Sequence, residues 1–151
     1  MNILTIDGRI SLIPHPTESL AGQIQQAANN GKSFNHVDLS TQDFRNSTFN
    51  NVNFSGADLT ECDFEGSTLI NVNFRQCRAL RAKFSNCQIR NCIFDQSDLS
   101  NSDFSGSSLI GGSFTMANLQ GAYFFCVRLE SIFFQEALFS HPNFSHPSPA
   151  S

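Results

Sequence analysis

The stretch "DLTECDFEGSTL", residues 58 to 69, decides how the rest of the chain is interpreted. It returns forty positions later as "DLSNSDFSGSSL", residues 98 to 109, with seven of the twelve letters identical. Within each copy, large apolar residues recur at intervals of five. Internal repetition of this kind is typical of a chain built from stacked, nearly equivalent units.

The period of five extends far beyond these two copies. In steps of five from Phe34 to Phe144, the residue is Phe, Leu or Ile at 22 of 23 positions, and the exception is Ala79. Five residues advance an α-helix by about 140° and turn a straight strand to its opposite face, so neither structure keeps these positions on one side. We therefore expect a corner in every pentad and a chain that winds as a polygonal coil.

Echoes at twenty residues predict four sides in each coil. "NVNF" at 51 to 54 recurs at 71 to 74, and Phe occupies every tenth position from 34 to 144. We expect these rings to form two ladders on opposite inner sides, with Ala79 as a weak point between them. The predicted core residues are Phe34, Phe44, Phe54, Phe64, Phe74, Phe84, Phe94, Phe104, Phe114, Phe124, Phe134 and Phe144.

The pentads "SGADLTECDFEGSTL" and "TMANLQGAYF" resemble the A(D/N)LxX-like repeats of the pentapeptide-repeat family. The resemblance covers residues 32–146 and implies an all-β solenoid, a right-handed quadrilateral parallel β-helix of nearly six coils. Right-handed crossovers are also the general rule for parallel strands. At about 4.8 Å per rung, the rod would be roughly 28 Å long.

Residues 1–31 are predicted to form an N-terminal cap, because an open solenoid needs covered ends. Asp7 and Gly8 lie between two β-rich runs, which indicates a hairpin. Thr17 is the expected N-cap of a short helix that ends at Gly31 and presents Leu20 and Ile24 on one face. Residues 147–151 would form a C-terminal tail.

Outward positions near the C-terminus become apolar at Tyr123, Phe125, Phe133 and Leu138. An exposed patch of this kind usually marks a contact surface. One interpretation is a homodimer through the C-terminal coils, which dimeric members of the family also use. The other is that the tail "HPNFSHPSPAS" folds back over the patch.

Two rows of aspartates are predicted on adjacent sides, and each row is interrupted by one cation. The first row is Asp38, Asp58, Arg78 and Asp98, and the second is Asp43, Asp63, Lys83 and Asp103. Some relatives imitate B-form DNA and inhibit DNA gyrase, so the resemblance implies a DNA mimic as one function. The alternative is ion pairing between rungs: Arg78 and Lys83 with the aspartates beside them, Arg81 with Glu61, Arg75 with Asp95 and Arg45 with Glu65.

Catalytic and metal-binding motifs are not evident in the sequence. Cys62, Cys77, Cys87 and Cys92 occupy small inward positions, and no two of them are twenty residues apart. The net charge of −4 argues against direct nucleic-acid binding, and the chain carries no apolar run that would span a membrane. We expect no enzyme activity, no metal and no cofactor, and a cytoplasmic location.

The sequence thus favours a non-enzymatic rigid module that binds another protein, of unknown identity, through a flat side or the apolar C-terminal patch. The first alternative is a DNA-mimicking inhibitor or protector of a type II topoisomerase such as gyrase. The second alternative is a translocated effector, a use known in the family.

Overall fold

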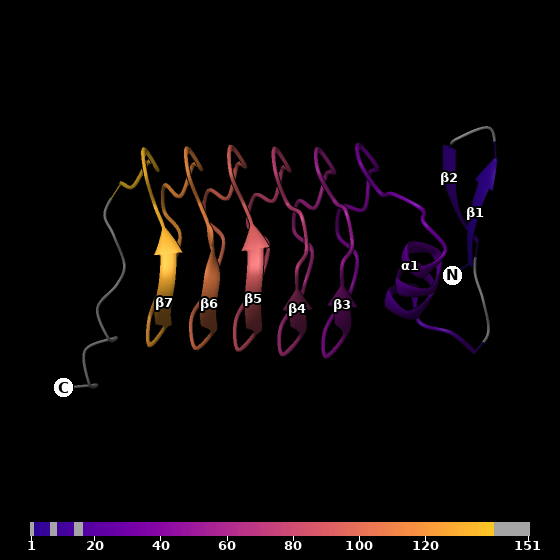
Figure 1. Cartoon of the computed structure of the whole chain (residues 1–151), viewed down its shortest axis with the longest axis horizontal. Helices are drawn as coiled ribbons and strands as arrows, with labels where there is room; N and C mark the ends of the chain where they lie inside the picture. Colours follow the sequence, from indigo (N-terminus) through magenta and orange to yellow (C-terminus); the bar gives the residue numbers. More distant parts are fainter. Residues whose placement is uncertain (1, 7–8, 14–16, 141–151) are drawn as a thin grey trace.

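The structure is a computed structural model that describes the backbone of residues 2–6, 9–13 and 17–140, and the side chains of residues 17–140. It is a parallel β-solenoid with a helix at its N-terminal end (Figure 1). The main sheet contains β3 (Thr48–Asn50), β4 (Thr68–Ile70), β5 (Gln88–Ile93), β6 (Ser108–Ser113) and β7 (Arg128–Phe133). Neighbouring strands pair in parallel at a separation of twenty residues, which confirms the predicted four-sided coil.

We number the four sides by their first large inward residue: side 1 begins at Phe34, side 2 at Leu39, side 3 at Phe44 and side 4 at Phe49. One circuit of twenty residues is a coil. The sheet of β3 to β7 lies on side 4, and isolated parallel bridges join the rungs of the other sides. Four complete circuits separate the five strands of side 4. The expected count of nearly six coils extended to Phe144, which lies outside the described residues.

Every corner of the solenoid contains a residue in the left-handed conformation. Each fifth residue from 36 to 136 has a positive φ, between 53° and 74°. Asn and Gly adopt this region most readily, which explains why both are frequent at the corners. At Gly66 a Cβ atom would also lie 2.3 Å from Oδ1 of Asn46 in the preceding coil. Glycine therefore avoids both the strain of the left-handed conformation and a close contact with that side chain.

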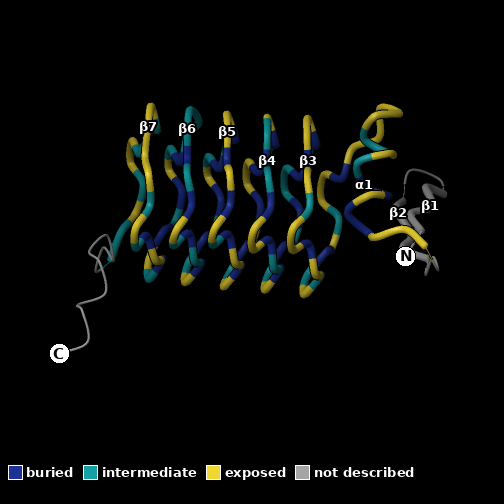
Figure 2. The backbone as a smooth tube through the Cα atoms, turned by 90° about the horizontal axis from the view of Figure 1, so that it is seen from below, coloured by how far each residue is buried: buried dark blue, intermediate teal, exposed yellow. Residues whose placement is uncertain are grey.

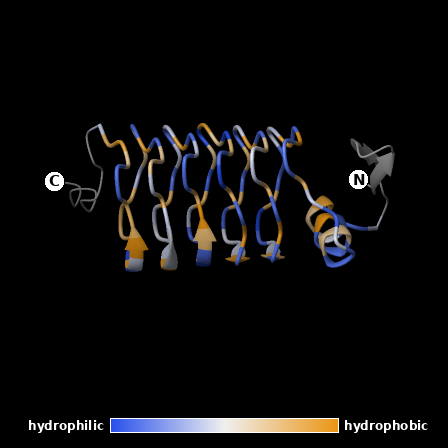
Figure 3. Cartoon of the chain, turned by 45° about the horizontal axis from the view of Figure 1, so that its top comes forward, coloured by the Kyte–Doolittle hydropathy of each residue, from blue (hydrophilic) through white to orange (hydrophobic). Residues whose placement is uncertain are grey.

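The interior is filled by the predicted Phe ladders. The ten ladder rings from Phe34 to Phe124 are buried, whereas Phe134 is partly buried. Phe84 stacks on Phe64 and Phe104 at centroid distances of 5.0 and 4.9 Å, and it meets Phe94 edge-on at 5.6 Å. These are favoured arrangements for aromatic rings. Buried segments recur on each coil (Figure 2), and apolar and polar residues alternate along it (Figure 3).

Ala79 keeps the inward register of its column. Its side chain is buried, whereas Leu80 is partly exposed on the outside. The exchange of a large side chain for a methyl group therefore does not shift the chain by one residue. The reduced packing that Ala79 should cause stays a prediction.

The N-terminal region contains the predicted hairpin and helix. β1 (Asn2–Ile6) pairs antiparallel with β2 (Arg9–Ile13), and the expected turn at Asp7 and Gly8 lies outside the described residues. Helix α1 (Leu20–Asn29) buries Leu20 and Ile24 against the core. The boundary proposed at residue 31 stays a prediction. No helix in the described ranges is long and apolar enough to cross a membrane.

The N-cap of α1 is Ser19, so the prediction of Thr17 is wrong. The Ser19 Oγ accepts a hydrogen bond of 3.1 Å from the Gly22 N–H. The helix begins at Leu20, which leaves Thr17 too far from the first turn to cap it. Gly31 has φ +79° and ends the helix as predicted.

Helix α1 also closes the open edge of the sheet through Gln25. Its Oε1 accepts a hydrogen bond of 2.7 Å from the Asn50 N–H, and its Nε2 donates one of 3.0 Å to the Asn50 carbonyl. A single side-chain amide thus replaces the peptide group of a missing neighbouring strand. Covering β3 in this way protects an edge that could otherwise pair with another chain.

The stacked core predicts a large effect for Phe84→Ala. Removal of a ring that is packed on four others should lower the free energy of unfolding by about 3–5 kcal/mol. Denaturant unfolding followed by circular dichroism measures the change. Met116→Ala is the matched control, because its side chain is 51% exposed outside the stacked core and its loss should change stability by less than about 0.5 kcal/mol. A loss below about 1 kcal/mol for Phe84→Ala would contradict the stacking.

Candidate functional surfaces

On sides 1 to 3, the residue before each large inward residue lies on the outside of the coil. Where this residue is Asp, its Oδ1 accepts a hydrogen bond from the backbone N–H two residues later. The Thr60 nitrogen lies 3.0 Å from Asp58 Oδ1, and the Ser105 nitrogen lies 2.8 Å from Asp103 Oδ1. The same bond is made by Asp38, Asp43, Asp63, Asp98, Asn53, Asn73 and Asn118. These residues therefore cap corners, which is a structural role for the predicted aspartate rows.

The rows themselves lie in the predicted register. Parallel bridges join the rungs of side 2 in the order Asp38, Asp58, Arg78, Asp98, Asn118 and Leu138. On side 3 the order is Asp43, Asp63, Lys83, Asp103 and Tyr123. Neither row is a continuous series of carboxylates.

Arg78 and Lys83 do not make the ion pairs expected of them. Within residues 17–140, neither cation forms an ion pair with a carboxylate. The neighbouring carboxylates are turned along their own corners: Asp98 Oδ1, for example, accepts a 2.7 Å bond from the Ser100 hydroxyl. The register was predicted correctly, but the aspartates are engaged at their own corners and lie beyond ion-pair distance of the two cations.

Two other predicted ion pairs are present. Arg81 lies 2.7 Å from the Glu61 carboxylate, and Arg75 lies 3.9 Å from that of Asp95. Both join neighbouring coils. They are exposed, so each should contribute little to stability.

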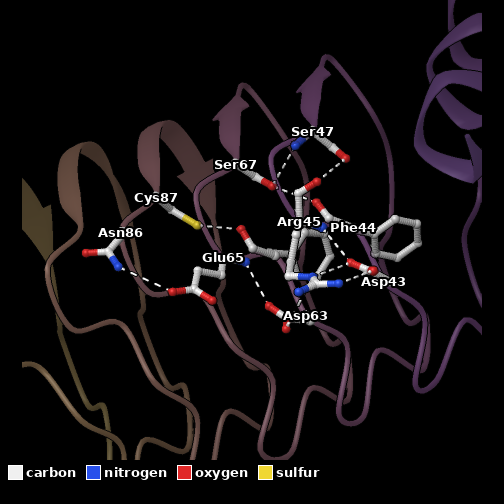
Figure 4. Close-up of polar contacts among 10 residues, drawn as sticks. Asp43, Phe44, Arg45, Ser47, Asp63, Glu65, Ser67, Asn86 and Cys87 are labelled. Carbon is white, nitrogen blue, oxygen red and sulfur yellow. Dashed lines mark hydrogen bonds and ion pairs between the residues drawn. The ribbon is translucent and has the colours of Figure 1, made fainter.

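Arg45 was expected to pair with Glu65, but it pairs with aspartates instead (Figure 4). Its guanidinium lies 2.8 Å from Asp43 and 3.9 Å from Asp63. The hydrogen bond from the Arg45 side chain is the main reason why the pKa of Asp43 is lowered to about 2. The pKa of Asp38 is also lowered, chiefly by a hydrogen bond from the Ser40 hydroxyl.

In the middle of the rod, acidic and basic residues lie on different coils. Residues 55–74 contain four acidic and no basic residues, and residues 95–114 contain three acidic and no basic residues. The coil between them, residues 75–94, contains five basic and no acidic residues. All five are exposed: Arg75, Arg78, Arg81, Lys83 and Arg90.

The apolar residues near the C-terminus lie on different sides rather than in one patch. Tyr123 is on side 3, Phe133 on side 1 and Leu138 on side 2, as their bridges show. Phe125 is partly buried at the corner after side 3, with its ring 5.9 Å from that of Tyr123. Leu129, the inward residue of side 4 in β7, is 41% exposed. We call Tyr123, Leu129, Phe133 and Leu138, one on each side, the apolar collar.

Four cysteines are built into the scaffold. Cys62, Cys77, Cys87 and Cys92 are buried, and Cys126 is exposed at a corner. The Cys62 thiol donates to the carbonyl of Leu39 in the preceding coil at 2.9 Å, as the Ser67 hydroxyl donates to Phe44 at 2.7 Å. Burial raises the pKa of Cys62, Cys87 and Cys92 to about 12. These thiols stay protonated at neutral pH and are poor nucleophiles.

The other candidate metal ligands do not gather. No group of three or more His, Cys, Asp or Glu that could hold a metal ion occurs in the part of the chain that the structure describes. His36 lies at a corner with its ring against Gly56. The remaining histidines, His15, His141 and His146, lie outside the described residues.

The environment of Asp43 predicts a pH-dependent ion pair. Its folded pKa of about 2 is below the ordinary value of 3.8, so its contribution to stability is present above pH 3.8 and disappears as the pH falls through about 2. A pH titration of the carboxyl carbon by NMR should give this low midpoint. Arg45→Gln should raise it toward 3.8, because the main cause is removed while the backbone N–H of residue 45 remains. Asp38 is the internal control, and an equal shift there would contradict the assignment to Arg45.

Comparisons with known proteins agree with this geometry. A family model for the pentapeptide repeat region matches residues 30–104, and a second model, for eight copies of the pentapeptide repeat, matches residues 94–124. A search of curated protein sequences finds no match.

Several solved structures are similar to the chain. A pentapeptide repeat protein, Rfr23, from the cyanobacterium Cyanothece 51142 is 19% identical over 78% of this chain and 89% of its own, with a TM-score of 0.44. One from the Arabidopsis thaliana thylakoid lumen is 28% identical over 62% and 69%, with a TM-score of 0.39. A trypsin-treated variant of QnrB1, a plasmid-mediated fluoroquinolone resistance protein, is 15% identical over 74% and 78%, with a TM-score of 0.40. The two family models, together with the five-residue register of the coil, establish that this chain belongs to the pentapeptide-repeat family.

Proposed function

We propose that this chain is a non-enzymatic, rigid module that binds another protein, and that its first partner is a second copy of itself. The observation that carries the proposal is the apolar collar. Phe133, Leu138 and Tyr123 are 67%, 56% and 43% exposed, although the equivalent positions of other coils are mostly polar. These side chains lie on different sides, but all of them are near the C-terminal end of the rod, which favours a contact surface at that end.

The placement of the collar favours an end-on contact. A partner lying along one flat side would cover one collar residue and leave the other three in water. A partner that meets the end of the rod can cover all four, together with the partly buried rings of Phe134 and Phe139. Two copies meeting end to end around a two-fold axis would present the same surface to each other, as isologous dimers do.

Side chains of the types used in catalysis are engaged in the scaffold. Aspartates cap corners, and the thiols of Cys62, Cys87 and Cys92 donate to carbonyls of the preceding coil. These roles support the proposal of a binding rather than a catalytic function. The odd number of cysteines, with no disulfide framework in the sequence, further leads us to propose a reducing compartment such as the cytoplasm.

The dimer is tested by static light scattering after size exclusion. The wild-type chain should have the mass of two copies, and Phe133→Asp should have the mass of one, because a buried unpaired carboxylate opposes association. Met116→Asp is the matched control: this residue is 51% exposed at a corner outside the collar, so the dimer should persist. A monomeric wild-type chain, or a dimer that is insensitive to Phe133→Asp, would contradict the end-on contact.

DNA mimicry is less well supported than protein binding through the collar. The carboxylates of sides 2 and 3 are explained by corner capping, and a coil with five cations and no acidic residue divides them. A DNA surface would instead present an uninterrupted series of negative charges.

We therefore expect the chain not to inhibit supercoiling by DNA gyrase. The control is the double variant Asp98→Asn and Asp103→Asn, which keeps both caps and should behave like the wild type. Inhibition that the double variant weakens, and that falls steeply with added salt, would show that the carboxylates imitate phosphates after all.

A further inference from the structure

One coil lacks the corner caps that its neighbours have on sides 2 and 3. Asp58 and Asp98 cap side 2 of the adjacent coils, and Asp63 and Asp103 cap side 3. The coil between them has Arg78 and Lys83 at these positions. Among the described residues, no side chain caps the N–H groups of Leu80 and Ser85. Two hydrogen bonds of the neighbouring coils are therefore absent here, and two cations occupy the capping positions.

These cations are available to a partner. Both are exposed, and the aspartates beside them are already engaged with backbone N–H groups of their own corners. Arg81 lies at the corner between the two sides, where it pairs with Glu61. We call Arg78, Arg81 and Lys83 the basic corner.

The basic corner is narrow. The rungs on both sides of it carry carboxylates, those of Asp58 and Asp63 before it and those of Asp98 and Asp103 after it. The positive strip is therefore one rung wide, or about 4.8 Å along the rod. A broad anionic surface, such as a nucleic-acid duplex, would place negative charge against these carboxylates as well as against the cations.

We propose that the basic corner binds an acidic segment of a partner protein in an extended conformation. A single extended chain is about as wide as one rung, so its carboxylates can meet the cations without overlying the flanking aspartates. Arginine matches carboxylates through paired hydrogen bonds, and lysine adds a mobile point charge. The site lies at least two coils from the apolar collar, so this inference and the proposed dimer can fail independently.

The test uses fluorescence anisotropy with a labelled oligoglutamate peptide at low salt, and an oligoglutamine peptide of equal length as the neutral reference. The key variant is the double substitution Arg78→Asn and Lys83→Asn. Asn caps the same corner position at residues 53, 73 and 118, so the variant should fold with a thermal midpoint no lower than that of the wild type. The matched control, Arg75→Gln with Arg90→Gln, removes the same charge from the same coil.

The expected result is binding of oligoglutamate alone, weakened about tenfold or more by the double Asn variant and less than about twofold by the control. Binding should also disappear as salt rises to about 0.5 M. Three outcomes would overturn the proposal: no preference over oligoglutamine, equal weakening by both double variants, or tighter binding of a DNA duplex than of the peptide. A double Asn variant less stable than the wild type would refute the argument that these positions were released from capping.

Discussion

A residue in the left-handed conformation at every corner is the constraint on which the whole solenoid depends. Because five is an odd number, a straight extended chain would turn alternate pentads outward, and the left-handed corner restores the inward phase each time. For residues other than Gly and Asn this conformation costs about 1–2 kcal/mol. Thr41 and Met116 adopt it nevertheless, with φ of 63° and 58°. Regular hydrogen bonds between rungs and stacked rings at about 5 Å must offset that strain.

The same corners account for most of the polar surface. An Asp or Asn placed just before an inward residue is in position to accept from the backbone N–H that the corner exposes. The side-chain oxygen therefore binds the protein's own backbone, as the short hydrogen bonds to Asp58 and Asp103 show. A row of such residues resembles a charged binding surface, but it arises because one local capping motif is repeated in each coil. Positions where that motif is absent therefore say more about a partner than positions where it is repeated.

The sequence predicts the fold well because the inward residues follow a one-dimensional period. For a residue such as Phe84, the residue number alone gives the side of the coil, the rung, and the neighbours twenty positions away. The same count places Tyr123, Phe133 and Leu138 on three sides, so their separation could have been anticipated, although a single patch was expected. The corner caps could also have been predicted from the sequence, because Asp and Asn recur just before inward residues. The partners of Arg45 could not be predicted in this way, because the choice among Asp43, Asp63 and Glu65 depends on side-chain directions that a period does not specify.

The two irregular coils differ in what they imply about binding. The collar combines one inward residue, Leu129 in the last described strand, with outward residues at positions that are mostly polar in other coils. These outward residues are Tyr123, Phe133 and Leu138. The basic corner differs, because it interrupts a capping motif that is present in the coils on both sides of it. Arg78 and Lys83 replace residues that would stabilise their corners, and an exchange of local stability for exposed charge is expected where a surface is used for recognition.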